Sequence, residues 1–343
     1  MKIIEDSIAA FASFIWGYPL LLLLIGGGIY LLVLSKFLPF RYFWHAIQVL
    51  RGKYDDPNDP GQISHFQALT TALSATVGMG NISGVAVAIA MGGPGAIFWM
   101  WISAVVGMST KFFTSSLAIM YRGKDSEGEL QGGPMYFITE GLGKKWKPLA
   151  IFFSACAMIG ALPVFNVNQL TQAVNDILLK PNGVEVTNYT NLVIGVFLVI
   201  ITSIVVLGGL KRIGKVTSRL VPSMVLLYFI LVVVILIVHI EVVPKYFLMI
   251  FTDAFSADFI KEESVLGGVV GALIILGIKR GAFSNEAGVG TAPMAHGAAK
   301  TDEPIREGLV AMLGPFIDTI IVCTLTALAI LVTGVWQTSD TNG

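Results

Sequence analysis

One stretch constrains this chain more than any other: residues 61–110 carry no Asp, Glu, Lys or Arg. A charge-free run of that length lies in lipid or in the interior of a protein. Its centre, residues 78–84, reads GMGNISG, where a simple membrane helix would hold leucine. Glycine frees the backbone from helical geometry, and backbone groups freed in hydrocarbon must line a cavity or bind something. We therefore expect a helix that is broken near the middle of the membrane.

A second interpretation of the same glycines is a tightly packed helix interface. Gly80 and Gly84 have the small-xxx-small spacing that lets two membrane helices approach closely. Packing does not require Asn81 between them, so this polar residue favours the broken helix. Helices broken at mid-membrane are the usual substrate sites of secondary transporters.

Composition places the chain in a membrane. The 343 residues are 55% hydrophobic and 13% charged, whereas soluble domains carry about 25% charged residues. The formal net charge is zero, which excludes the basic footprint of a nucleic-acid-binding protein. Cys156 and Cys323 stand in separate apolar runs and give neither a disulfide framework nor a metal motif. The sequence shows neither a spaced histidine cluster nor a nucleophile–base pair, so we expect no enzyme and no cofactor.

Hydrophobic runs predict a series of membrane helices. They cover about residues 18–38, 66–91, 95–120, 148–175, 190–208, 219–240, 264–299 and 305–334. We expect residues 3–16 on the membrane surface and residues 241–262 in a surface hairpin. A loop after the helix 190–208 carries four cations: Lys211, Arg212, Lys215 and Arg219. The run 264–299 exceeds one span of about 20 residues, and its polar centre, SNEAGVGT at 284–291, predicts a second break.

Basic residues orient these helices. Most Lys and Arg residues fall in the loops that follow the first, third, fifth and seventh helices. The positive-inside rule makes those loops cytoplasmic and puts the N-terminus outside. Helices 66–91 and 264–299 then cross in opposite directions, and their centres share a small-Gly-apolar-Gly-polar pattern at 77–81 and 287–291. Such a pairing is typical of an inverted repeat whose broken helices meet at mid-membrane.

Four motifs make the sequence recognisable. They are GNI at 80–82, GGPGAIFWMW at 92–101, GGPMY at 132–136 and FSNEAG at 283–288. With them, essentially the whole chain resembles the sodium:alanine symporter family, also called the alanine or glycine:cation symporters. The resemblance implies the all-α polytopic fold of the amino acid–polyamine–cation superfamily, with two inverted five-helix repeats behind an extra first helix. It also implies import of a small neutral amino acid, alanine or glycine, with Na⁺ across the cell (inner) membrane.

The resemblance also bears on how the chain is divided. Family members continue through three or more further membrane helices, so the second repeat is expected to be incomplete in this chain. We expect an N-terminal segment with the extra helix and a cytoplasmic loop at 1–62, and a first five-helix repeat at 63–243. Residues 244–343 would hold a surface segment and two helices of the second repeat. The alternatives are an H⁺-coupled permease of the same fold, a passive channel, and a non-transporting fragment of such a symporter.

A zwitterionic substrate needs partners for both of its charges. Backbone N–H groups that begin a half-helix suit its carboxylate, whereas carbonyls that end the other half-helix suit Na⁺ and the ammonium group. The expected substrate contacts are Thr76, Met79, Gly80, Asn81, Gln169, Phe283, Asn285 and Gly288. The expected Na⁺ ligands are Ala75, Thr76, Val77, Asn81, Asp318 and Thr319.

Several of these residues also have a structural interpretation. Gln169 suits an interhelical hydrogen bond equally well, and Phe283 suits the core. Asp318 lies inside the last expected helix, where an unpaired carboxylate is costly. The related fold offers a side-chain oxygen to sodium at this position, which favours a cation site. The alternative is an ion pair with one of three intramembrane cations: Lys111, Lys279 and Arg280.

Overall fold

The computed structural model describes residues 2–256 and 268–338, and most of this part of the chain is helical. The α-helices are α1 (Lys2–Ile15), α2 (Tyr18–Leu21), α3 (Gly27–Leu34), α4 (Leu38–Arg41), α5 (Phe43–Leu50), α6 (His65–Thr76), α7 (Met79–Gly92), α8 (Gly95–Met120), α9 (Pro134–Tyr136), α10 (Lys147–Gly160), α11 (Val164–Val174), α12 (Asn188–Val206), α13 (Gly209–Val238), α14 (Val243–Thr252), α15 (Gly268–Asn285), α16 (Thr291–His296), α17 (Pro304–Ala311), α18 (Leu313–Pro315), α19 (Thr324–Thr333) and α20 (Val335–Thr338).

Turns of π- or 3₁₀-helix extend several of these helices. They are η1 (Leu22–Gly26), η2 (Phe137–Gly141), η3 (Lys144–Trp146), η4 (Asn175–Leu179), η5 (Lys180–Asn182), η6 (Asp253–Phe255) and η7 (Phe316–Cys323). The strands β1 (Gly123–Lys124) and β2 (Leu130–Gln131) pair antiparallel in a small hairpin.

Five helices in the described ranges are long and apolar enough to cross a bilayer, and the bent pair α6–α7 makes a sixth. The chain is therefore a multi-pass, mainly helical membrane protein, as the hydrophobic runs predicted. Two further expected helices, 148–175 and 264–299, are each divided into shorter pieces. The first span is longer than expected, because the apolar stretch runs from Glu5 to Leu34.

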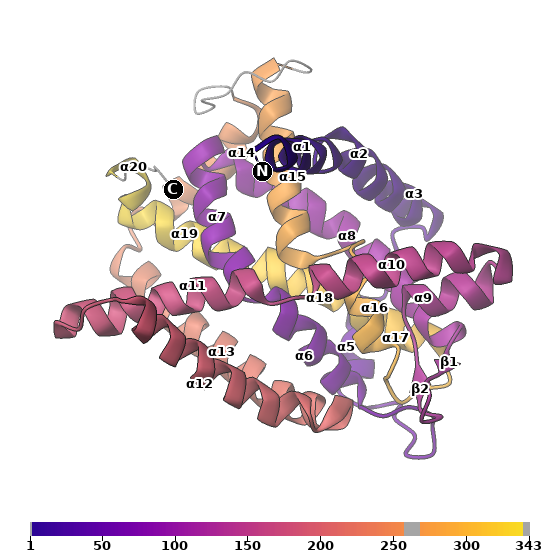
Figure 1. Ribbon diagram of the computed structural model, residues 1–343. Coiled ribbons are helices and arrows are strands. Elements are labelled where there is room, and N and C mark those ends of the chain that lie inside the picture. The colour runs from indigo at the N-terminus through magenta and orange to yellow at the C-terminus, as the bar shows by residue number, and fades with distance from the viewer. Residues whose placement is uncertain (1, 257–267, 339–343) are drawn as a thin grey trace.

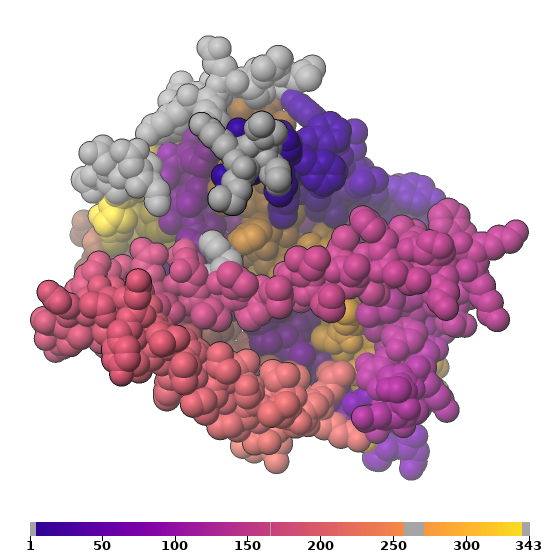
Figure 2. Space-filling view, in the orientation of Figure 1, coloured from indigo at the N-terminus to yellow at the C-terminus, as the bar shows by residue number. Residues whose placement is uncertain are grey.

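The buried core lies around α8. This helix packs against α15 and α17 and also contacts α3, α7 and α16. By contrast, the apolar window of α12 is wholly unburied and that of α13 nearly so. Figure 1 shows α10, α11, α12 and α13 at the periphery, and Figure 2 shows α10 and α11 as one band across this face of the molecule. The chain thus has a buried bundle of helices and a more exposed outer layer, of which α13 packs against α6 and α19.

Both predicted helix breaks are present. The first separates α6 from α7 at Val77 and Gly78, where the two axes bend by 43°. The second separates α15 from α16 at residues 286–290, where Glu286 has a left-handed φ of 51°. The expected start of this second helix at 264, and residues 257–262 of the expected surface hairpin, lie outside the described residues.

Two expected helix boundaries were wrong. Residues 148–175 do not form one helix, because α10 ends at Gly160 and α11 begins at Val164. Pro163 lies in this interruption, where it lacks an N–H and disfavours helical geometry in the residue before it.

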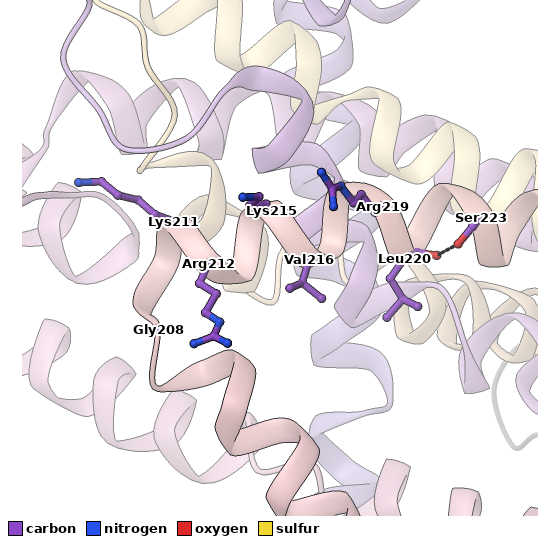
Figure 3. Close-up of a pocket in the computed structure, with 8 residues that line it drawn as sticks. All are labelled: Gly208, Lys211, Arg212, Lys215, Val216, Arg219, Leu220 and Ser223. Carbon is purple, nitrogen blue, oxygen red and sulfur yellow. Dashed lines mark hydrogen bonds between the residues drawn. The ribbon is translucent and has the colours of Figure 1, made fainter.

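The second wrong boundary is the start of α13, which begins at Gly209 and not near residue 219. The cations expected in a loop are therefore helical, which suits the good helix propensity of Lys and Arg. Figure 3 shows them lining a shallow pocket along the first turns of α13. The residues drawn there are Gly208, Lys211, Arg212, Lys215, Val216, Arg219, Leu220 and Ser223.

Candidate functional site

The first break brings a buried amide into the core. Asn81, in the first turn of α7, is 1% exposed. Its Oδ1 accepts a hydrogen bond from the backbone N–H of Gly78 at 2.8 Å, so the side chain caps its own half-helix. The N–H groups of Met79 and Gly80 lie in the turn that has no acceptor within the helix. The sequence analysis predicted that N–H groups at this position bind the carboxylate of the substrate.

The other end of the Asn81 amide faces the last membrane helix. Its Nδ2 donates to Asp318 Oδ1 at 2.8 Å and to the Asp318 carbonyl at 3.0 Å. It also lies 3.1 Å from Ser284 Oγ, at the end of α15. Three helices that are far apart in the sequence therefore meet at one fully buried carboxylate.

Asp318 accepts further hydrogen bonds on its second oxygen. Ser284 Oγ donates to Oδ2 at 2.8 Å, and Thr319 Oγ1 donates to the same atom at 2.7 Å. The Asp318, Ser284 and Thr319 side chains are each 1% exposed or less. A carboxylate sealed from water in this way needs such donors, since burying it without them is very costly.

The helical geometry of the last span brings Asp318 and Cys323 to the same side of the helix. Residues 316–323 form the π-helix η7 within the span from Pro304 to Thr333. A π-helix pairs residues five apart, which places Asp318 and Cys323 together, and π-turns recur at functional sites. Cys323 Sγ lies 3.3 Å from both Asn81 Nδ2 and Ser284 Oγ.

Asn285 connects the second break to the same cluster. Its Nδ2 donates to Thr319 Oγ1 at 3.2 Å, and its Oδ1 accepts from the Ala287 N–H at 3.0 Å. Asn285 and Asn81 thus have corresponding roles, since each caps the backbone at one break while its amide nitrogen contacts the last helix.

The three cations considered as partners for Asp318 differ in how deeply they are buried. Lys111 of α8 is 2% exposed, and its charge acts on Asp318 and Glu286 across the core. In the described part of the chain, however, no ion pair within 4 Å includes Asp318. Lys279 and Arg280 are half-buried on α15. Lys111 is therefore the buried one of the three candidate cations.

The remaining predicted residues are less closely gathered. Thr76 is buried at the end of α6, while Ala75 is exposed and Val77 half-buried. Gln169 is half-buried on α11, and within the described ranges no hydrogen bond joins it to either break. Their expected roles stay predictions.

Two other predicted substrate contacts face the first span. Phe283 is 42% exposed, and its ring lies 6.3 Å from that of Trp16. A Cβ on Gly288 would come 2.3 Å from Leu24 Cδ2. The structure thus places both residues against the N-terminal helix, and their expected contact with substrate stays a prediction.

Sequence reasoning missed Ser284 and Cys323 as members of the cluster. Ser284 stood in the FSNEAG motif next to the predicted Asn285, so the motif held a signal for it. Cys323 held no such signal, because its approach to Asp318 depends on the π-turn.

Comparison with known proteins shows the family of the chain. A sequence profile of the sodium:alanine symporter family matches residues 1–343. The sodium/alanine symporter AgcS of Methanococcus maripaludis is 45% identical over 328 residues, covering 94% of this chain and 69% of that protein.

Two further relatives are similar over nearly all of this chain. An uncharacterized transporter of Haemophilus influenzae is 43% identical over 99% of this chain and 72% of its own length. The "Probable sodium/glutamine symporter GlnT" of Bacillus subtilis is 35% identical over 100% of this chain and 68% of its own length. On the full-length match and these identities, the chain belongs to the sodium:alanine symporter family.

Proposed function

We propose that this chain takes part in Na⁺-coupled import of a small neutral amino acid, alanine or glycine. The observation that carries the proposal is the meeting of both broken helices at the buried Asp318. Membership of the family and the name of the AgcS relative support Na⁺ and alanine as cargo. On this proposal the N-terminus lies outside the inner membrane, residues 63–243 form one repeat, and residues 244–343 begin its inverted counterpart.

The proposed Na⁺ site is built on Asp318. Hard monovalent cations favour oxygen ligands, and one carboxylate surrounded by hydroxyls and carbonyls is such a set. The hydroxyls of Ser284 and Thr319 now donate to Asp318, but a hydroxyl can rotate and present a lone pair to a cation. Asn81 would hold the carboxylate through Nδ2, since its oxygen caps Gly78. The carbonyls of residues 75–77 complete the proposed ligand set.

The proposed amino acid site lies beside the first break. The N–H groups of Met79 and Gly80 begin α7, whose positive end attracts a carboxylate. The two broken helices approach so closely here that a Cβ on Gly80 would lie 2.9 Å from Ser284 Cα. That approach favours a small side chain. Thr76, Gln169, Phe283 and Asn285 remain proposed contacts, whereas for Gly288, where a Cβ would meet Leu24, we propose a packing role instead.

Coupling of amino acid uptake to the Na⁺ gradient can be tested in proteoliposomes. At about −100 mV one Na⁺ gains about 2.3 kcal/mol, and a tenfold Na⁺ gradient adds about 1.4 kcal/mol. Together these allow accumulation of alanine by roughly 500-fold. We expect uptake of alanine and glycine to follow the Na⁺ gradient. Glutamine, a larger amino acid, should compete less well for uptake.

Binding by calorimetry should be measured beside uptake, because binding does not require a complete transport cycle. Alanine binding that strengthens with Na⁺ supports the proposed site even where uptake is slow. Uptake that ignores Na⁺ and follows a pH gradient would assign H⁺ as the coupling ion. Downhill equilibration without accumulation would identify a passive channel, and both results would contradict the proposal.

A further inference from the structure

A second buried ionisable cluster lies away from Asp318, at the opposite ends of the two broken helices. It joins His65, the first residue of α6, His296, the last residue of α16, and Glu307 of α17. Their side chains are 2%, 1% and 0% exposed. His65 Nδ1 contacts one carboxylate oxygen of Glu307, and His296 Nδ1 contacts the other.

The protons of this cluster can be assigned from its contacts. An ionised carboxylate only accepts hydrogen bonds, so each Nδ1 carries a hydrogen. His296 Nε2 is buried, and the described part of the chain offers it no hydrogen-bond partner. A proton there would leave a buried, charged N–H unsatisfied, so this ring is neutral. With His65 also neutral, the cluster as a whole carries one negative charge.

His65 is the ring that can accept another proton. Its Nε2 lies 3.7 Å from Asp55 Oδ1, and the Asp55 side chain is 44% exposed. A proton on Nε2 would therefore face a carboxylate near water, while Glu307 would balance the charge at Nδ1. The added proton brings the cluster to net zero and breaks none of its contacts.

The other charges around the cluster have partners of their own. Arg306 donates to the carbonyl of Tyr54 at 3.2 Å, and Tyr54 also lies against the ring of His45. Arg122 donates to four backbone carbonyls, those of Pro60, Gly297, Ala299 and Thr301. Burial lowers the pKa of Arg122, while Glu307, Asp302 and Asp59 act in the opposite direction. Asp55 is thus the anion placed directly at the free nitrogen of His65.

The cluster fastens together the ends of both broken helices. Beside it, the Gln62 N–H donates to the Ala298 carbonyl at 2.8 Å, and the Lys300 N–H donates to the Ile63 carbonyl at 2.7 Å. Ile63 and Ala299 form a parallel bridge. The start of α6 and the end of α16 are therefore held by backbone pairing and by one shared carboxylate.

We propose that His65, Glu307 and His296 form a proton-binding site that sets how firmly these two half-helices are held together. Protonation of His65 turns its hydrogen bond to the ionised Glu307 into an ion pair, which adds Coulomb attraction to the bond, and it attracts Asp55. Acid on this side of the membrane thus tightens the junction. The consequence for transport, slower exchange with this side, rests on the proposed function, but proton binding requires neither Na⁺ nor an amino acid.

Hydrogen exchange of the full chain in lipid nanodiscs tests the proposal. We expect backbone protection of residues 60–70 and 294–308, corrected for intrinsic exchange, to rise in one step as the pH falls between about 8 and 5. Asp55→Asn removes the anion that favours the proton, so the midpoint should fall by about 0.5–1 pH unit. Asp56→Asn, an exposed neighbour of Asp55, is the matched control and should leave the midpoint in place. His65→Gln should abolish the step.

The outcomes separate this proposal from the proposed function. A step that is unchanged in both Asp55→Asn and His65→Gln overturns the proton site, and so does an equal shift in Asp56→Asn. Asp55 is partly exposed, so its variant should keep the fold if His65→Gln does not. The exchange experiment contains no Na⁺ or alanine. Intact titration without Na⁺-driven uptake would contradict only the proposed function, and the reverse would contradict only the proton site.

Discussion

The two helix breaks share a five-residue pattern but differ in shape. At the first, only Val77 and Gly78 separate two half-helices that remain within 43° of one line. At the second, residues 286–290 separate the long α15 from the short α16, and three of them have left-handed φ angles. The first break is closed by its own Asn81, whereas the second uses both Asn285 and a hydrogen bond from Thr291 to Glu286.

This difference in shape suggests that the first break binds ligands and that the second mainly stabilises the fold. The first break turns the side chain of Asn81 toward Asp318, so this residue faces the proposed site. At the second break, Ser284 and Asn285 face the same site, but the following glycines pack against neighbours. Gly288 lies against Leu24, and Gly290 against Phe153. We therefore expect changes at the first break to alter binding and changes within 286–291 to alter stability.

The largest effect is expected from Asp318→Asn. The substitution keeps the size of the side chain but removes the charge to which both breaks are hydrogen-bonded. Hydrogen bonds to charged groups contribute about 1.5–3 kcal/mol, so the Na⁺ concentration for half-maximal alanine binding should rise about tenfold or more. Calorimetric titration of Na⁺ at fixed alanine measures this change.

If Asp318 only stabilises the fold and does not bind Na⁺, the opposite result is expected. Asp318→Asn would then bind Na⁺ normally but unfold at a lower temperature, and Lys111→Met would restore its Tm. Lys111 is the relevant partner because it is the buried one of the three candidate cations. That combination would contradict the cation site.

The next effect is expected from Gly80→Ala, with Gly84→Ala as a matched control one helical turn away. A Cβ on Gly80 would lie 2.9 Å from Ser284 Cα, whereas a Cβ on Gly84 would meet only the Met79 carbonyl, at 3.9 Å. Overpacking costs about 1–3 kcal/mol, and here it pushes apart the two breaks. We expect Gly80→Ala to weaken alanine binding more than glycine binding. Equal losses for the two amino acids, or a similar effect of Gly84→Ala, would show that substrate size is not sensed at Gly80.

The fold could be predicted from the sequence wherever hydrophobic length and glycine position determine it. The helix predicted at 95–120 matches α8, and both breaks lie at the predicted glycines. Two helix boundaries were predicted wrongly because hydrophobicity alone was used to place them. Pro163 interrupts an otherwise apolar run, and the four cations of α13 join a helix because their long side chains reach water from it.

The site could be predicted less completely. Asn81 and Asp318 were expected to face each other, and the structure brings them within 2.8 Å. The shared pattern at 77–81 and 287–291 indicated where the second helix breaks but not which residues approach Asp318. Ser284 and Cys323 reach it through the packing of α15 and the π-turn η7, which hydrophobic periodicity does not encode.

Gly288→Ala is expected to affect stability more than binding. Gly288 has a φ of 91°, and a left-handed conformation costs a residue with a Cβ about 1–2 kcal/mol. The added methyl would also approach Leu24. We expect a lower Tm that Leu24→Ala restores in part, because the second change relieves the contact but not the backbone strain. A large loss of alanine affinity at unchanged Tm would instead place Gly288 in the substrate site.

The smallest effect is expected from Thr291→Val, which keeps the shape of the side chain and removes one hydrogen bond. Thr291 Oγ1 donates to Glu286 Oε2 at 2.6 Å and so ties together the two ends of the second break. A net hydrogen bond contributes about 1 kcal/mol, so exchange of the amides at 286–291 should increase by about fivefold. Alanine binding should not change, because neither residue contacts Asp318, Asn81 or Ser284. If Thr291→Val weakened alanine binding as much as Gly80→Ala, the second break would share the binding role that we propose for the first.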